Sequence, residues 1–235
     1  MEKPRIESYY PHSNEKEVIR DFLQSHLTRS YQRVLDVGCG SGLLTDTLKS
    51  KSKDLHLIEI NPHYEETLKK KFPDSEIFIG DIWNAKLHND YDLILISQSL
   101  YYHAENKWLP LIHHLHKHLN ENGQIIIILN KDQGDWWSWV SKIWLSHPES
   151  LKFSYIPSSE LIAKIRLHYQ TNHATVSYKV EFNDEDIFKN FIKTACVPIK
   201  ENESDAKKKL ERALSSRANI NLKQNYYSDL ITINK

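Results

Sequence analysis

Residues 34–42 read Val34-Leu35-Asp36-Val37-Gly38-Cys39-Gly40-Ser41-Gly42, a short apolar run followed by three closely spaced glycines. The apolar run predicts a buried strand over 33–37, and the following pattern predicts a helix over 41–50. A strand, a glycine loop and a helix in this order form the first unit of a doubly wound nucleotide-binding sheet. Glycine permits a tight turn and lets a ligand approach the backbone, and the amides at the helix start favour an anionic group. An ordinary strand-to-helix turn is the competing interpretation.

Composition favours a soluble globular protein. The 235 residues suffice for one large α/β domain or a domain with a cap, and 40% hydrophobic residues supply a core. Lys+Arg and Asp+Glu both number 31, so the formal net charge is zero. This balance argues against binding to nucleic acid or to an anionic membrane through overall positive charge. Cys39 and Cys196 make no disulfide framework, and the charged start of the chain resembles no secretory signal. We therefore expect a cytoplasmic protein, as a monomer or weak homodimer, without nucleic-acid or membrane partners.

Strands and helices alternate through the first half of the chain. A helix is predicted over 14–27, with Ser13 or Asn14 as its cap, and lies within an N-terminal segment (1–30). Further strands are predicted over 55–60, 76–79, 91–96 and 124–129, and helices over 64–72 and 105–120, the latter ended by Asn122-Gly123. This alternation predicts an α/β fold, a mostly parallel sheet with helices on both faces.

The second half breaks the alternation and predicts a helical insertion or cap. Helices are expected over 135–145, 158–168, 184–196 and 204–214, with strands over 174–182 and 230–233. No linker or repeat divides the chain. The simplest account is one domain, 1–235, in which 131–225 includes cap elements on the substrate side.

Acidic residues follow the first three predicted strands. Glu59 ends the strand 55–60, where a carboxylate accepts hydrogen bonds from vicinal ribose hydroxyls, and a solvated strand-end acid is the alternative. Asp81 follows the strand 76–79, with a simple turn residue as the alternative. Asp36 precedes the glycines, where dinucleotide loops usually carry small or apolar residues. A NAD-dependent dehydrogenase is further disfavoured because the chain has no Tyr-x-x-x-Lys pair.

The stretch Val-Leu-Asp-Val-Gly-Cys-Gly-Ser-Gly resembles motif I of the class I S-adenosylmethionine (SAM) methyltransferases. The resemblance implies a Rossmann-like class I methyltransferase fold, SAM as cofactor and S-adenosylhomocysteine as product. It implies that Asp36 and the glycine loop line the methionine part, that Glu59 holds the ribose and that Asp81 reads the adenine amino group. The cofactor-binding residues expected are Asp36, Gly38, Cys39, Gly40, Glu59, Ile60, Asp81, Ile82 and Gln98.

Outside these motifs the chain resembles histamine N-methyltransferase and its relatives. The segments that carry this resemblance are His12-Ser13-Asn14-Glu15, Gln98-Ser99-Leu100-Tyr101-Tyr102, Gly134 to Trp144 and Tyr155-Ile156-Pro157-Ser158-Ser159-Glu160-Leu161. It implies that Glu15 binds a substrate amine, that Gln98 and Tyr102 face the substrate, and that Asn225 matches a C-terminal asparagine. Motif I here has the common Asp-Val-Gly-Cys-Gly form and the chain is shorter, so the fold and cofactor transfer better than histamine as substrate.

An amine acceptor fits the chemistry of these residues. For methyl transfer from a sulfonium, the enzyme aligns the lone pair of a neutral acceptor nitrogen with the methyl group and excludes water. No strong general base is required. The expected catalytic residues are Gln98, Tyr102 and Glu15, and aromatic faces would surround a cation. The substrate-binding residues expected are Tyr9, Tyr10, Glu15, Tyr102, Trp136, Trp137 and Asn225. Purely structural roles are the alternatives. The tryptophans would only pack the cap against the sheet, and Glu15 would only stabilise the first turn of its helix through the helix dipole.

Three function classes remain. The favoured one is a SAM-dependent methyltransferase that acts on a small molecule, at an amine or imidazole nitrogen. The second acts on oxygen or on a macromolecule, and the third is a SAM-binding interaction module without catalysis. No metal is expected, because in the run of histidines over 113–118 only His114 and His118 share a helix face.

Overall fold

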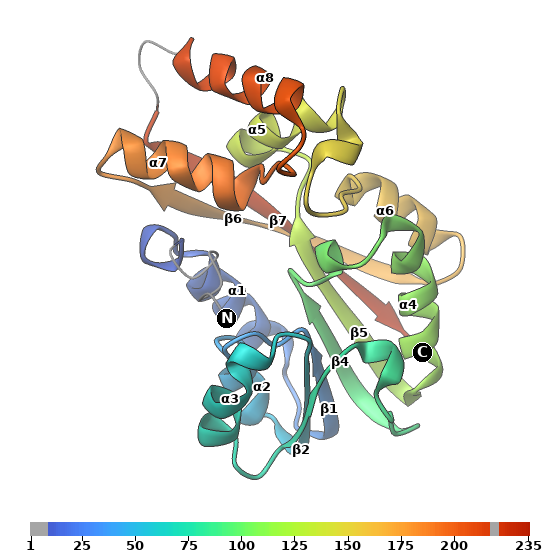
Figure 1. The fold of residues 1–235 in the computed structure, drawn as a ribbon. Helices are drawn as coiled ribbons and strands as arrows, with labels where there is room; N and C mark the ends of the chain where they lie inside the picture. Colours follow the sequence, from blue (N-terminus) through green and yellow to red (C-terminus); the bar gives the residue numbers. More distant parts are fainter. Residues whose placement is uncertain (1–8, 217–220) are drawn as a thin grey trace.

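One mixed sheet of seven strands forms the centre of the computed structural model, which describes residues 9–216 and 221–235 (Figure 1). The strands are β1 (Tyr31–Val37), β2 (Ser52–Glu59), β3 (Glu76–Ile79), β4 (Tyr91–Ser97), β5 (Leu119–Asn130), β6 (Thr171–Glu181) and β7 (Lys223–Asn234). Their order is β3-β2-β1-β4-β5-β7-β6; β1 to β5 run parallel, and β7 and β6 add antiparallel pairs. The doubly wound parallel core predicted from the alternating pattern is confirmed.

Helices connect the strands and cover both faces of the sheet. They are α1 (Glu15–His26), α2 (Thr45–Lys49), α3 (Glu65–Lys71), α4 (Glu105–Lys117), α5 (Gly134–Trp144), α6 (Ser158–Arg166), α7 (Glu185–Phe191) and α8 (Ser204–Ser215). Short 3-10 turns lie at Tyr10–His12, Pro62–Tyr64, Ile82–Asn84, Leu100–Tyr102 and Pro148–Ser150, and a π-helical turn at Ile192–Cys196. Within the described ranges, none of the helices has both the length and the apolar character needed to cross a bilayer.

The apolar strands divide their side chains between two cores. Leu93 and Leu95 of β4 pack with α1, α2 and α3, whereas Ile94 and Ile96 pack with α4 and α6. Alternate residues of a strand point to opposite faces, so a continuous apolar run serves a sheet that is covered on both sides. The sheet is thereby held between two helical layers, and the carboxyl ends of its parallel strands stay free for other elements.

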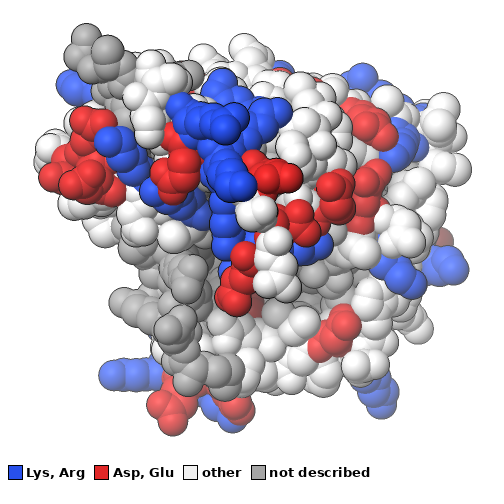
Figure 2. Space-filling view, turned by 45° about the horizontal axis from the view of Figure 1, so that its top comes forward, with Lys and Arg blue, Asp and Glu red and all other residues white. Residues whose placement is uncertain are grey.

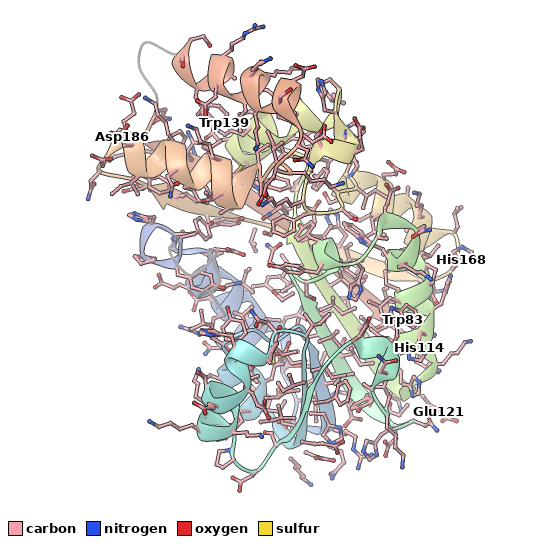
Figure 3. All side chains as sticks on the ribbon, in the orientation of Figure 1. Trp83, His114, Glu121, Trp139, His168 and Asp186 are labelled. Atoms are coloured by element: carbon pink, nitrogen blue, oxygen red, sulfur yellow. The ribbon has the colours of Figure 1, made fainter. Side chains whose placement is uncertain are left out.

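A third core forms the cap above those carboxyl ends. Helices α5, α7 and α8 pack with one end of β6 and β7, and in Figure 1 they lie above the parallel strands. Trp139 lies inside the cap (Figure 3), fully buried, with its ring 5.9 Å from that of Phe188. Its indole N–H donates to the Gln224 side chain at 3.2 Å. The cap is therefore anchored on the antiparallel strands.

The predicted helix end at Asn122-Gly123 is wrong. Helix α4 ends at Lys117, and β5 begins two residues later, so Gly123 lies inside a strand. Leu119 of β5 pairs with Tyr91 of β4, and the register of the two strands shifts between Tyr91 and Leu93. A Cβ on Gly123 would lie 2.6 Å from the Tyr91 carbonyl oxygen. The glycine permits a close approach of two strands rather than a helix stop.

Other boundaries differ where local pattern and tertiary contacts disagree. The helix expected from residue 41 begins at Thr45, because the glycine loop continues in turns to that point. The terminal strand, predicted over 230–233, begins at Lys223, since its polar first half is held by pairing with β6. Asn14 does not cap α1 with its side chain: its Oδ1 accepts from the Lys179 amide of β6 at 2.8 Å.

Gly42 closes the glycine loop where α3 packs against it. Its φ is +75°, and an added Cβ would lie 2.5 Å from the Phe72 ring. Gly40 has a φ of +56° but open space around it. Both alanine variants carry the left-handed backbone penalty of about 1–2 kcal/mol, and overpacking adds about 1–3 kcal/mol only at Gly42. We expect urea unfolding to show Gly42→Ala as clearly less stable than Gly40→Ala. Equal losses would contradict a packing role for Gly42.

Candidate functional site

A cavity of about 610 Å³ lies between the carboxyl ends of the parallel strands and the cap. The loops after β1, β2, β3 and β4 form its floor, and α1, α5, the segment 151–155, the turn after α7, and β6 and β7 form its walls and roof. Open α/β sheets bind ligands at this edge, where the loops diverge. The cavity is therefore the candidate site.

Glu59 holds the glycine loop to the end of β2. Its side chain is buried, and its carboxylate accepts from the Gly40 amide at 2.7 Å and the Asn61 amide at 2.8 Å. The amides of Gly38 and Cys39 both donate to the Ile58 carbonyl. Ile60, 55% exposed, also lines the cavity. The loop is thus prearranged, and each carboxylate oxygen of Glu59 retains acceptor capacity for a ligand hydroxyl.

Asp36 lies buried at the base of the loop. It is 3% exposed and accepts from the Thr45 hydroxyl at 2.6 Å. Burial, together with the nearby charge of Glu59, raises the pKa of Asp36 to about 6, against the opposing effect of the hydrogen bond from Thr45. Burial also raises the pKa of the Cys39 thiol, so this cysteine stays neutral and is no nucleophile. Asp36 is a charge that a cationic ligand in the cavity would stabilise.

The loop after β3 contributes apolar contact more than charge. Gly80 and Ile82 line the cavity, whereas Asp81 is absent from its lining in the described structure. The Asp81 carboxylate accepts from the Trp83 amide at 3.1 Å and so starts the short turn at Ile82–Asn84. Ile82 lies where it was expected, and Asp81 is a turn residue beside the site.

Gln98 joins four elements at the centre of the cavity. Its side-chain NH₂ lies 3.0 Å from Glu15 Oε1 on α1, 3.2 Å from Asn130 Oδ1 at the end of β5 and 3.2 Å from Ser228 Oγ on β7. Its φ of +53° is unusual for a residue other than glycine. Its Oε1 is buried and has no hydrogen-bond partner among the described residues. A strained residue with an unpaired acceptor in a cavity is typical of a functional position.

Glu15 places a buried carboxylate in the cavity. It is 5% exposed, and Lys16 Nζ lies 3.7 Å from its Oε1. An acidic residue at a helix start can interact with the helix dipole from the protein surface. Burial of Glu15 in the cavity is not needed for that role.

Aromatic side chains also line the cavity that holds this carboxylate. The residues expected at the substrate that do line the cavity are Tyr9, Tyr10, Tyr102 and Trp136. Tyr9 stacks on Phe191 with ring centroids 5.0 Å apart, and Trp136 lies 5.2 Å from Tyr155. Burial raises the pKa of Tyr9 and Tyr155, so these phenols remain neutral. Such π-faces around a carboxylate form a site for a cation.

Two expected substrate residues lie outside the cavity lining in the described structure. Trp137 packs against Trp144 and Tyr155, with centroid distances of 5.7 and 5.5 Å. Asn225 is exposed on β7, where its backbone N–H donates to the Asp135 carboxylate at 2.8 Å. Strand alternation turns the neighbouring Tyr226 into the cavity and Asn225 away from it. Of the N-terminal segment, residues 1–8 lie outside the described residues.

Several cavity residues escaped the sequence analysis. They are Tyr101, Asn130, Phe153, Tyr155, Tyr178, Phe191, Cys196 and Tyr226. Asn130 ends the parallel strand β5, so the rule that selected Glu59 and Gln98 also applies to it. Tyr101 follows β4 in the turn Leu100–Tyr102. The others come from the cap and the segment 151–155, whose placement over the sheet leaves no local trace in sequence.

The buried Asp36 makes stability depend on pH. Unfolded, its carboxyl ionises near 3.8, and folded near 6, so the folded state holds the proton more tightly and loses stability as pH rises through this window. Asp36→Asn removes this loss. Between pH 4 and pH 8 we expect the unfolding free energy of the variant, relative to the wild type, to rise by about 3 kcal/mol, measured by urea unfolding. The exposed Asp46→Asn serves as control, and a pH-independent difference for Asp36→Asn would contradict the assignment.

Comparisons with known proteins agree with this geometry. Residues 10–164, more than half of the chain, match the family described as "Methyltransferase domain". A malonyl-[acyl-carrier protein] O-methyltransferase of Anoxybacillus flavithermus is 29% identical over 130 residues, which cover 52% of this chain and 48% of the relative. The chain thus spans about half the length of this curated relative.

Solved structures share the fold. A candidate methyltransferase of Bacillus halodurans has a TM-score of 0.67 at 10% identity, covering 92% of this chain and 98% of that one. The N-methyltransferase NodS of Bradyrhizobium japonicum, bound to S-adenosylhomocysteine, has a TM-score of 0.56 at 13% identity, covering 94% and 86%. A geranyl diphosphate C-methyltransferase of Streptomyces coelicolor has a TM-score of 0.57 at 12% identity, covering 93% and 76%.

The cavity floor fits SAM as cofactor. Gly40 leaves open space for a ligand at the loop, and Glu59 ends β2 with acceptor capacity. The matched family, the doubly wound sheet and this glycine loop agree. The chain belongs to the class I SAM-dependent methyltransferase domain family and is an enzyme that uses SAM.

Proposed function

We propose that this methyltransferase acts on a small molecule and transfers the methyl group to an amine or imidazole nitrogen. The observation that carries the proposal is the buried Glu15 carboxylate, hydrogen-bonded to Gln98 inside an aromatic cavity. A buried carboxylate without a fully neutralising partner favours a cationic ligand. An amine or imidazole substrate with a second, protonated nitrogen supplies that charge.

The cofactor half of the site follows from the glycine loop. In our proposal Glu59 accepts from the ribose hydroxyls, Asp36 and the loop from Gly38 through Cys39 to Gly40 face the methionine part, and Ile60 and Ile82 flank the adenine. All of these residues line the cavity. Asp81 starts the turn beside the cavity floor, and in our proposal it reads the adenine amino group.

The acceptor half uses α1 and the aromatic walls. Glu15 binds the distal ammonium, while Tyr9, Tyr10, Tyr102 and Trp136 enclose it. Gln98 lines the cavity and orients the nucleophilic nitrogen, and its NH₂ shares two hydrogens among Glu15, Asn130 and Ser228. Aromatic enclosure excludes water and supports the alignment of lone pair and methyl group.

Bound SAM supplies the sulfonium methyl for in-line displacement. The acceptor nitrogen enters neutral, so the protein needs to remove a proton only after transfer. His103 lines the cavity, and burial lowers the pKa of His103, so its imidazole is neutral near pH 7. It offers a base for that late proton, whereas His12 stacks on Phe182 and is absent from the cavity lining in the described residues.

An oxygen acceptor is the second candidate, because the curated relative is named for O-methylation of malonyl-[acyl-carrier protein]. A carboxylate acceptor would bring a second negative charge near Glu15, and like charges in a buried site repel. A macromolecular acceptor is disfavoured by the mixed surface: Figure 2 shows basic and acidic side chains side by side on the visible face, without a track of one sign. Nitrogen in a small molecule therefore remains preferred.

Glu15→Gln tests the acceptor side of the proposal. The amide preserves the acceptor for Gln98 but removes the charge, so kcat/KM for a cationic amine is expected to fall by about 30-fold, equivalent to about 2 kcal/mol. The loss should lie mainly in KM, and SAM affinity should stay unchanged. Transfer from labelled SAM to a panel of small amines, imidazoles, carboxylates and alcohols measures the first quantity, and calorimetry the second.

The matched control is Glu17→Gln, on the exposed side of the same first helical turn. It should leave transfer and binding unchanged. Product only with carboxylates or alcohols would overturn the nitrogen acceptor, and an equal loss in Glu17→Gln would show that helix electrostatics, not substrate binding, explains the effect of Glu15→Gln.

A further inference from the structure

A group of metal-ligating side chains lies apart from the cavity. His56 in β2, Glu76 at the start of β3 and His88 in the loop before β4 bring one ligand atom each to within 4.8 Å of the others. Among the described residues this is the one such group of three or more. None of the three lines the cavity. The group is therefore separate from the methyl-transfer site and independent of its proposed substrate.

The spacing suits a tetrahedral ion. Glu76 Oε2 lies 3.8 Å from His56 Nε2 and 3.5 Å from His88 Nε2. Ligands at about 2.0–2.1 Å from Zn²⁺ lie about 3.3–3.4 Å from one another, so small side-chain rotations bring these atoms into place. Glu76 and His88 are largely exposed, which gives an ion access from solvent and leaves both side chains free to adjust.

A second set of contacts orients the buried ligand. His56 is 6% exposed, and its Nδ1 lies 2.9 Å from the Tyr91 hydroxyl. When Nδ1 donates to this hydroxyl, Nε2 keeps its lone pair, which a metal ion can take in place of the hydrogen bond between Nε2 and Asp54. Metal-bound histidines are held in this way by a partner on their other nitrogen.

Asp54 competes with an ion for the buried histidine. Its Oδ1 lies 2.9 Å from His56 Nε2, and its other oxygen accepts from Arg33 Nε at 2.7 Å. Asp54 is not among the three residues whose ligand atoms lie within 4.8 Å of one another. Two imidazoles and one carboxylate form a three-residue donor set for Zn²⁺, and water fills the fourth position. Without a metal, His56 and Asp54 form only a hydrogen-bonded pair, and experiment separates the two cases.

We propose that His56, Glu76 and His88 bind one Zn²⁺ at the edge of the sheet formed by β2 and β3. The ion ties the loop between β3 and β4 to the sheet. The same loop begins with Gly80 and Ile82, which line the cavity. The three ligands lie away from the cavity, so the ion has a structural role and takes no part in methyl transfer.

Zn²⁺ titration into tag-free, EDTA-treated full-length protein tests the site. Calorimetry should show one equivalent bound, and thermal unfolding should move to higher temperature with Zn²⁺. His88→Ala and Glu76→Gln change exposed side chains, so both variants should fold, with Zn²⁺ affinity reduced at least ~10-fold. Zinc X-ray absorption of the loaded wild type should report two imidazoles and further oxygen ligands, with no sulfur.

The matched control is the double variant His114→Ala, His118→Ala on α4. These rings lie 5.0 Å apart, and His114 packs beside Trp83 (Figure 3). This pair is a second set of neighbouring histidines, away from the proposed site, and its removal should leave Zn²⁺ binding intact. Unchanged affinity in His88→Ala, binding lost only in the control, or no stoichiometric binding by the wild type would overturn the proposal.

Discussion

The amide of Gln98 is the contact on which the site depends. Its NH₂ is shared among Glu15, Asn130 and Ser228, so that α1, β4, β5 and β7 meet at one side chain. Asn130 in turn accepts from the Tyr178 hydroxyl of β6 at 2.8 Å. Because buried polar groups are costly when unpaired, these partners constrain one another's positions. The left-handed backbone of Gln98 is tolerated within this network.

The two halves of the cavity are built on different principles. On the floor, backbone amides of the glycine loop converge on Glu59 and Ile58, so the proposed cofactor side is shaped by main chain. Beside it, the buried Asp36 carboxyl carries a desolvation cost that a cationic ligand would offset. The roof consists of aromatic side chains from the cap, so the proposed acceptor side is shaped by packing. In this proposal, variation of the cap changes the acceptor while the floor still binds SAM.

The names of the relatives fit this division. O-, N- and C-methyltransferases appear among proteins that share the sheet or its sequence. Their common fold positions the cofactor, and function is decided by the residues grafted around it. In this chain the informative residue is Glu15, a buried charge that enters from the N-terminal helix.

Sequence patterns were sufficient for the elements that depend on local chemistry. The run 34–42 predicted β1, its loop and the doubly wound core, because apolar periodicity and glycine spacing act over a few residues. The same patterns placed Glu59 and Gln98 at strand ends. They failed at Gly123, at the first half of β7 and at Asn225, because strand pairing across the chain sets those positions. The roof of Tyr155, Tyr178 and Tyr226, and the meeting of His56 with His88, depend on contacts between distant segments, which only the folded sheet and cap bring together.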